Sequence, residues 1–117
     1  MNYSPKGSLY FVLSLFFVLY TSSCMSQYGQ LGNTIVGIEL DDKFGKSVAI
    51  SDDGLTIVTG ASQDNSNGTD NGYVRVYKYI GGSWIQQGQT IIGEYVGDTF
   101  GDAVSISGDG LTIAIGA

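Results

Sequence analysis

The chain repeats itself at a fixed spacing, and this feature limits the folds it can adopt more than any other. Residues 41–61 read DDKFGKSVAISDDGLTIVTGA and residues 97–117 read GDTFGDAVSISGDGLTIAIGA, which are identical at 13 of 21 positions when Phe44 is aligned with Phe100. The match extends upstream, where QLGNTIVG (30–37) corresponds to QQGQTIIG (86–93). A period of about 56 residues indicates stacked structural units that bury their apolar faces against one another. We expect repeat copies at 28–61 and 84–117, in a fragment of about one and a half repeats.

Alternation of apolar and polar side chains predicts strands over 47–51, 55–61 and 72–79. The first two are joined by Ser-Asp-Asp-Gly (51–54), which is typical of a tight hairpin because such turns need residues with positive φ. A turn at Gly81-Gly82 precedes a fourth short strand, 83–88. Four short antiparallel strands per repeat, apolar on both faces, predict an all-β fold made of β-propeller blades, here incomplete.

The third predicted strand has two unlike faces. Val74 and Val76 lie on one face, and the other carries an arginine and tyrosines, at positions 73, 75, 77 and 79. The tyrosines are open to two interpretations, a half-buried sheet face or a recognition surface. Phe44, Phe100 and Trp84 are predicted to pack between blades.

Paired dipeptides resemble a known repeat family. Phe44-Gly45 precedes Gly60-Ala61, and Phe100-Gly101 precedes Gly116-Ala117, in an ordered string with SxDG, GxVxVY and SW segments. This string resembles the FG-GAP repeats of integrin-α-type β-propellers, in the form found in exported microbial proteins. The resemblance implies a β-propeller used for adhesion or ligand recognition, and further blades of the same chain.

The chain departs from that family at two places. Ser62 stands where the GAP proline is usual. The calcium loop of integrin-type repeats is reduced to residues 51–54, too short to supply the roughly six to eight oxygen ligands that calcium prefers. The family's metal site therefore does not carry over to this turn, and we expect Asp52 and Asp53 to be turn formers.

Residues 1–26 read as a signal peptide. Lys6 precedes an apolar run at 9–20, shorter than the roughly 20 residues of a membrane-spanning helix, and small residues follow at 21–26. The single cysteine, Cys24, has two interpretations: the lipid-bearing residue of a lipoprotein, or a small residue removed with the signal. We expect a secreted or cell-surface protein that contacts the membrane only through the signal or a lipid anchor.

Charge and composition exclude several function classes. All eleven acidic residues lie at or after Glu39, against four basic residues beyond the signal segment. The sequence thus has no basic surface for nucleic acid. It also has no histidine, which removes the commonest general base and Ser-His catalysis. We therefore expect that the chain is not an enzyme. The sequence indicates no cofactor apart from the calcium ion considered next.

Residues 62–72, SQDNSNGTDNG, are the one candidate metal site. Asp64, Asn67 and Asp70 place oxygen ligands at regular intervals, which is the chemistry that calcium needs. The spacing matches no EF-hand loop, and an exposed polar turn is the alternative interpretation.

Three functions are compatible with these observations. The first is an exported or cell-surface propeller that mediates adhesion or binds protein or glycan ligands. The second is the recognition propeller of a larger secreted hydrolase. The third is a purely structural extracellular repeat protein.

Overall fold

A computed structural model of the chain describes residues 28–63 and 71–117. The chain divides into two compact units, Met1–Gln30 and Leu31–Ala117, and all the described strands belong to the second. The predicted signal peptide, Cys24 and the three predicted metal ligands Asp64, Asn67 and Asp70 lie outside the described residues. Within the described residues, no helix has the length and apolar character needed to cross a membrane.

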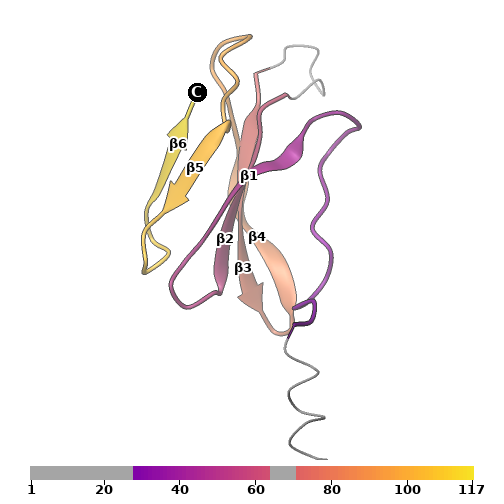
Figure 1. The fold of residues 1–117 in the computed structure, drawn as a ribbon, viewed down its shortest axis with the longest axis vertical. Coiled ribbons are helices and arrows are strands. Elements are labelled where there is room, and N and C mark those ends of the chain that lie inside the picture. The colour runs from indigo at the N-terminus through magenta and orange to yellow at the C-terminus, as the bar shows by residue number, and fades with distance from the viewer. Residues whose placement is uncertain (1–27, 64–70) are drawn as a thin grey trace, which may run out of the picture. The chain divides into compact units, whose positions relative to one another are not determined.

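The described fold is all-β, as predicted, and consists of two antiparallel sheets (Figure 1). The first is a four-stranded meander in which each strand pairs with its neighbour in the chain. Its strands are β1 (Phe44–Ile50), β2 (Thr56–Ala61), β3 (Tyr73–Ile80) and β4 (Ser83–Ile92). The second sheet is a hairpin of β5 (Ala103–Ile106) and β6 (Ile113–Gly116). The sheets remain open, as in an incomplete propeller.

The hairpin β5–β6 has the same register as β1–β2, displaced by the sequence period. Ser47 pairs with Gly60 in the first sheet, and Ala103 pairs with Gly116 in the second. All four residue pairs of β5–β6 match pairs of β1–β2 in this way. The repeated sequence is therefore also a repeated structure.

The two hairpin turns have the same pattern of hydrogen bonds. The Ser51 hydroxyl donates to the Asp53 carboxylate over 2.6 Å, and the Leu55 amide donates to the same oxygen over 2.9 Å. The second turn has the same two bonds: the Ser107 hydroxyl donates to the Asp109 carboxylate over 2.6 Å, and the Leu111 amide donates to it over 3.0 Å. Asp53 is thus a turn former, as predicted, and the bonds from Ser51 and Leu55 lower the pKa of its carboxyl.

The first sheet has two unlike faces, a packed face and an aromatic face. The packed face, which β5 covers, carries small and aliphatic side chains at positions 47, 49, 58, 60, 74 and 76. The aromatic face carries Val48, Ile50 and Ile57 on β1–β2 and Tyr73, Tyr77, Tyr79 and Trp84 on β3–β4. The predicted division of β3 is confirmed: Val74 and Tyr73 lie on opposite faces and both are fully buried.

The segment before β1 covers the β3–β4 half of the aromatic face. The Trp84 indole donates to the Leu31 carbonyl over 2.8 Å, and the Trp84 amide donates to the Asn33 side chain over 2.8 Å. The Trp84 ring also packs against Tyr79, with centroids 5.2 Å apart. The described contacts of Trp84 are thus with β3 and with this segment, and its packing between blades stays a prediction.

Candidate functional site

Three connections of the chain meet at one end of the first sheet, and we call this end the loop rim. The described residues of the loop rim are 37–43, 62–63, 71–72 and 93–102. The first connection leads into β1, the second joins β2 to β3, and the third joins β4 to β5. The antiparallel order of the strands brings all three to the same end of the sheet (Figure 1).

Asp42 is the buried centre of the first connection. One carboxylate oxygen accepts the Tyr73 hydroxyl at 2.6 Å and the Ile38 amide at 3.0 Å, and also the Glu39 amide at 3.3 Å. The other oxygen accepts the Phe44 amide at 2.9 Å. A carboxylate that satisfies several backbone donors fixes the path of a loop that has no regular structure.

The environment of Asp42 shifts two pKa values in opposite directions. Burial raises the pKa of the Asp42 carboxyl, but the hydrogen bonds from Tyr73, Phe44, Glu39 and Ile38 outweigh it and leave that pKa below its ordinary value. Burial and the bond to Asp42 raise the pKa of the Tyr73 phenol. At neutral pH the pair is therefore an ionised acceptor and a neutral donor.

Backbone conformation also fixes the connections that lead into β1 and β5. Asp41 and Lys43 have φ of 67° and 55°, a left-handed conformation that is uncommon outside glycine. The equivalent residues Gly97 and Thr99 have φ of 84° and 52°. Such strained conformations persist only where the surroundings hold them, and they concentrate at functional sites.

The connection between β2 and β3 is hydrogen-bonded to the other two connections at both of its described ends. The Gln63 amide donates to the Asp42 carbonyl over 3.3 Å, and the Asn71 side chain donates to the Gly93 carbonyl over 2.9 Å. The buried Asn71 Oδ1 has no hydrogen-bond partner among the described residues. The three connections thus form one surface rather than three separate tips.

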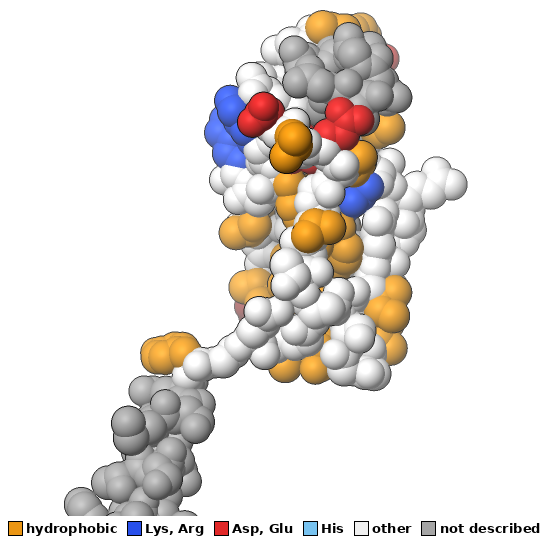
Figure 2. All heavy atoms as spheres, turned by 90° about the vertical axis from the view of Figure 1, so that its right-hand side faces the viewer, with side chains coloured by type: hydrophobic (Ala, Val, Ile, Leu, Met, Phe, Trp, Pro, Cys, Tyr) orange, Lys and Arg blue, Asp and Glu red, His pale blue; other side chains and the backbone are white. Residues whose placement is uncertain are grey.

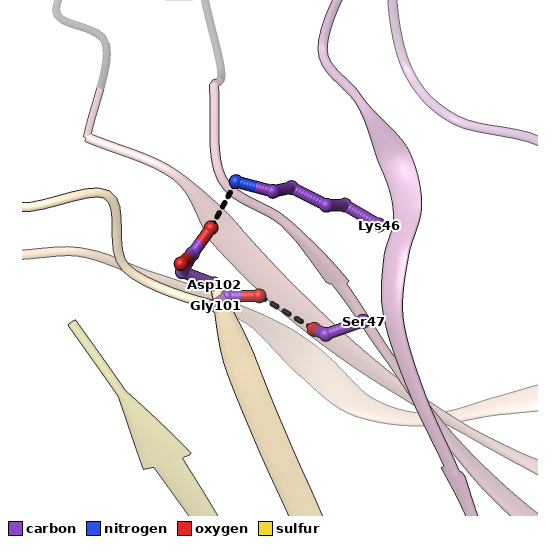
Figure 3. Close-up of polar contacts among 4 residues, drawn as sticks. All are labelled: Lys46, Ser47, Gly101 and Asp102. Carbon is purple, nitrogen blue, oxygen red and sulfur yellow. Dashed lines mark hydrogen bonds and ion pairs between the residues drawn. The ribbon is translucent and has the colours of Figure 1, made fainter.

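Polar contacts between the loop rim and β1 join the two repeats (Figure 3). The Ser47 hydroxyl on β1 donates to the Gly101 carbonyl over 2.6 Å. The Lys46 ammonium forms an ion pair with Asp102, and both side chains are half exposed. The hydrogen bond and charge of Lys46 lower the pKa of the Asp102 carboxyl, and Ser62 and Lys43 lower it further.

The Phe-Gly dipeptide of the second repeat packs against the Gly-Ala dipeptide of the first. A Cβ on Gly60 would overlap the Gly101 carbonyl and the Ser47 hydroxyl. A Cβ on Gly101 would lie 2.8 Å from the Tyr73 carbonyl oxygen and 3.0 Å from Val74 Cγ2. The two dipeptides therefore recur because adjacent repeats approach through backbone, which only glycine permits.

The loop rim exposes apolar side chains at equivalent positions of the two repeats. Leu40 is 92% exposed, and Val96, which holds the same position in the second repeat, is 68% exposed with Tyr95 beside it at 62%. Charged side chains gather at one end of the face shown in Figure 2, above a run of hydrophobic side chains. Apolar groups exposed on loops with a fixed backbone are available for contact with a ligand.

None of the residues that the sequence predicts for metal binding or lipidation is among the described residues. Asp64, Asn67, Asp70 and Cys24 lie outside the described residues, and in the described part no cluster of three or more acidic, cysteine or histidine side chains is positioned to hold a metal ion. Sequence reasoning missed Asp42, although it recurs as Asp98. It also missed Leu40 and Val96. Both are apolar and stand one repeat period apart, which could have identified them from the sequence.

Comparison with known proteins supports the repeat assignment. A model of the FG-GAP repeat matches residues 38–77. No curated protein and no solved structure matches the chain. The matched residues include the whole of the hairpin β1–β2 and most of β3. The chain therefore contains a segment that matches the FG-GAP repeat, residues 38–77, and this segment lies in the first sheet.

Proposed function

We propose that this chain is a non-catalytic recognition repeat that acts outside the cell or at its surface, and that the loop rim binds a protein or glycan ligand. The FG-GAP match to residues 38–77 supports a binding or structural repeat of the β-propeller type. The ligand-binding part of the proposal rests on the exposed Leu40 and Val96 at equivalent rim positions.

The rim has the physical properties that binding requires. Its backbone is fixed by Asp42 and by left-handed residues, so little conformational entropy is lost when a ligand binds. Leu40 and Tyr95 offer apolar and aromatic contact, and the surrounding carboxylates offer hydrogen-bond acceptors for hydroxyl or amine groups. A calcium ion held by Asp64, Asn67 and Asp70 would add a cation at the connection between β2 and β3, and this remains part of the proposal.

A matched pair of substitutions tests the proposal. Leu40→Ser removes an apolar side chain at the rim, and Leu111→Ser removes one that is 84% exposed in the β5–β6 turn at the other end of the strands. Both variants and the unaltered chain are screened on arrays of extracellular proteins and glycans. We expect Leu40→Ser to weaken binding about three- to tenfold, the effect of one apolar contact, while Leu111→Ser binds normally.

Two results would contradict the proposal. Equal loss of binding in both variants would show that the rim has no special role. Absence of any bound protein or glycan would favour the alternative of a purely structural extracellular repeat.

A further inference from the structure

The chain enters the first sheet at the loop rim, because residues 38–43 lead into β1 there. Before that point, residues 31–37 run along the sheet from its opposite end, and we call them the strap (Figure 1). The opposite end carries the β1–β2, β3–β4 and β5–β6 turns, and we call it the turn end. The strap therefore determines at which end of the sheet the preceding part of the chain joins it.

Contacts with the start of β4 hold the strap at the turn end. The Trp84 indole donates to the Leu31 carbonyl over 2.8 Å, and the Trp84 amide donates to the Asn33 side chain over 2.8 Å. Gly32, between these two bonds, has a φ of 73°, and a Cβ there would lie 3.0 Å from the Tyr79 ring and 3.1 Å from the Trp84 ring. Only glycine suits this combination of left-handed backbone and close approach.

The two ends of the strap are fixed at the two ends of the sheet. At the loop rim, the Ile38 amide donates to the Asp42 carboxylate over 3.0 Å. β4 has 10 residues, which corresponds to about 30 Å between the loop rim and the turn end. Without its contacts to Trp84 the chain would be held at Ile38, and the residues before it would join the molecule at the loop rim. The contacts move this junction to Leu31, at the turn end.

The position of the junction limits how the molecule can stand on a membrane. The sequence predicts attachment before the strap, through the signal segment or a lipid on Cys24. Leu31 is seven residues after Cys24, and an extended chain of this length reaches at most about 25 Å. That reach is shorter than the sheet, so a lipid on Cys24 would not allow the molecule to stand inverted with its loop rim on the membrane. A junction at Ile38 would allow it.

We infer that the strap orients the membrane-attached protein, with the turn end toward the lipid surface and the loop rim away from it. The inference rests on the surface location in the proposed function, but not on the identity of the ligand. A loop rim that faces away from the membrane is accessible to ligands in the surroundings of the cell. The strap thus serves binding through position, because its residues need not touch the ligand.

Fluorescence quenching in right-side-out membrane vesicles tests this orientation. The vesicles come from cells that express the full chain, and lipids with a quencher on the headgroup are added to the outer leaflet. A thiol-reactive dye is attached to Leu111→Cys at the turn end or to Val96→Cys at the loop rim, where the native side chains are 84% and 68% exposed. The wild type, whose only cysteine is Cys24, gives the background. We expect several-fold stronger quenching at position 111 than at position 96.

A matched pair of glycine substitutions, each made in both dye variants, tests the role of the strap. Gly32→Val places a branched side chain at positive φ and against two aromatic rings, so it should release the strap from β4. Gly29→Val is the control, because a Cβ on Gly29 would meet no atom within 4 Å. We expect Gly32→Val to abolish the difference in quenching between the two positions, and Gly29→Val to leave it unchanged.

Equal quenching at the two positions, or stronger quenching at position 96, overturns the inference. A protein that the vesicles do not retain also overturns it, even if the protein binds a ligand on the arrays. In contrast, strong quenching at position 111 supports the orientation even if no ligand binds, so the failures of the two proposals are distinguishable.

The folding of the strap variants is checked by circular dichroism. A folded Gly32→Val variant that keeps the difference in quenching overturns the role of the strap. If Gly32→Val does not fold, Trp84→Phe replaces it, because this change retains a ring beside Tyr79 but removes the indole donor to Leu31. The difference in quenching should then decrease, and an unchanged difference overturns the inference.

Discussion

Asp42 and Asp98 occupy the same repeat position but have different surroundings. Asp42 is buried and accepts hydrogen bonds from the Tyr73 hydroxyl and three backbone amides. The Asp98 carboxylate is exposed and accepts no hydrogen bond among the described residues. The repeat therefore conserves an aspartate at this position, but only Asp42, which has Tyr73 of β3 as a partner, is buried and hydrogen-bonded.

We predict that Asp42→Asn destabilises the fold by about 2 kcal/mol at neutral pH, because charged hydrogen bonds are lost and buried donors remain. The pKa of Asp42 is lowered in the folded state, so its contribution is present above the unfolded pKa of about 4 and is lost as the pH falls through the folded pKa. The stability gap between wild type and Asp42→Asn should therefore shrink below about pH 4. Denaturant unfolding at several pH values measures this difference in the free energy of unfolding.

Asp98→Asn is the control for this prediction and should change stability by less than about 0.5 kcal/mol, as exposed substitutions usually do. A gap for Asp42→Asn that stays constant between neutral and acid pH would show that its carboxylate is not the stabilising group.

At the scale of the elements, the repeats are held together by close backbone contact. The FG dipeptide of one repeat lies against the GA dipeptide of the repeat before it, with Ser47 donating to the Gly101 carbonyl. Gly116 is the equivalent of Gly60, but a Cβ there would meet only Ala103, at 3.3 Å. The glycine at this repeat position thus meets the other repeat in the first copy, whereas its described neighbour in the second copy is its own strand partner.

Gly60→Ala should destabilise the protein by about 1–3 kcal/mol, the usual cost of adding a methyl group to a filled contact. Gly116→Ala should be neutral or stabilising by up to about 1 kcal/mol, because alanine is favoured over glycine in a strand. Denaturant unfolding followed by Trp84 fluorescence compares the two variants. Equal destabilisation by both would show that Gly60 is required for its own strand rather than for the contact between repeats.

Local patterns predicted the elements well where pairing partners lie close in sequence. The repeat period, the Asp-Gly turns and the two faces of β3 were all predictable from the sequence. The similarity of 30–37 to 86–93 was less informative, since 86–93 spans the end of β4 whereas 30–37 forms no strand. A strand needs a partner, and β3 supplies one only to the second of these segments.

For the candidate site, composition predicted binding rather than catalysis, and the resemblance of the FG and GA dipeptides predicted the repeat. The meeting of three connections at the loop rim was not predictable, because Asn71 and Gly93 are 22 residues apart and are joined only by the fold. The contact of Trp84 with Leu31 was not predictable for the same reason, since the two residues lie 53 positions apart.

At the scale of the whole molecule, the described part presents a loop rim that is rich in acidic residues. The surface role proposed for it depends on export, which the sequence of residues 1–26 predicts. Export therefore needs its own test, separate from the binding experiments.

Fusion of residues 1–26 to a reporter enzyme should direct secretion, with processing close to Cys24. Labelled palmitate should be incorporated if Cys24 is the lipid-bearing residue, and Cys24→Ser should then abolish the label. A secreted reporter without label would assign Cys24 to the removed signal, and a reporter retained in the cytosol would contradict the localisation.

The meander of the first sheet also sets the order in which the molecule can assemble. Each of its strands pairs with the strand made just before or just after it, so the sheet is complete as soon as β4 has been synthesised. Contacts between sequence neighbours close short loops and form quickly. The second repeat then docks onto a finished surface, where Gly60 already leaves room for its backbone. Synthesis and folding can therefore proceed in the same direction along the chain, one repeat at a time.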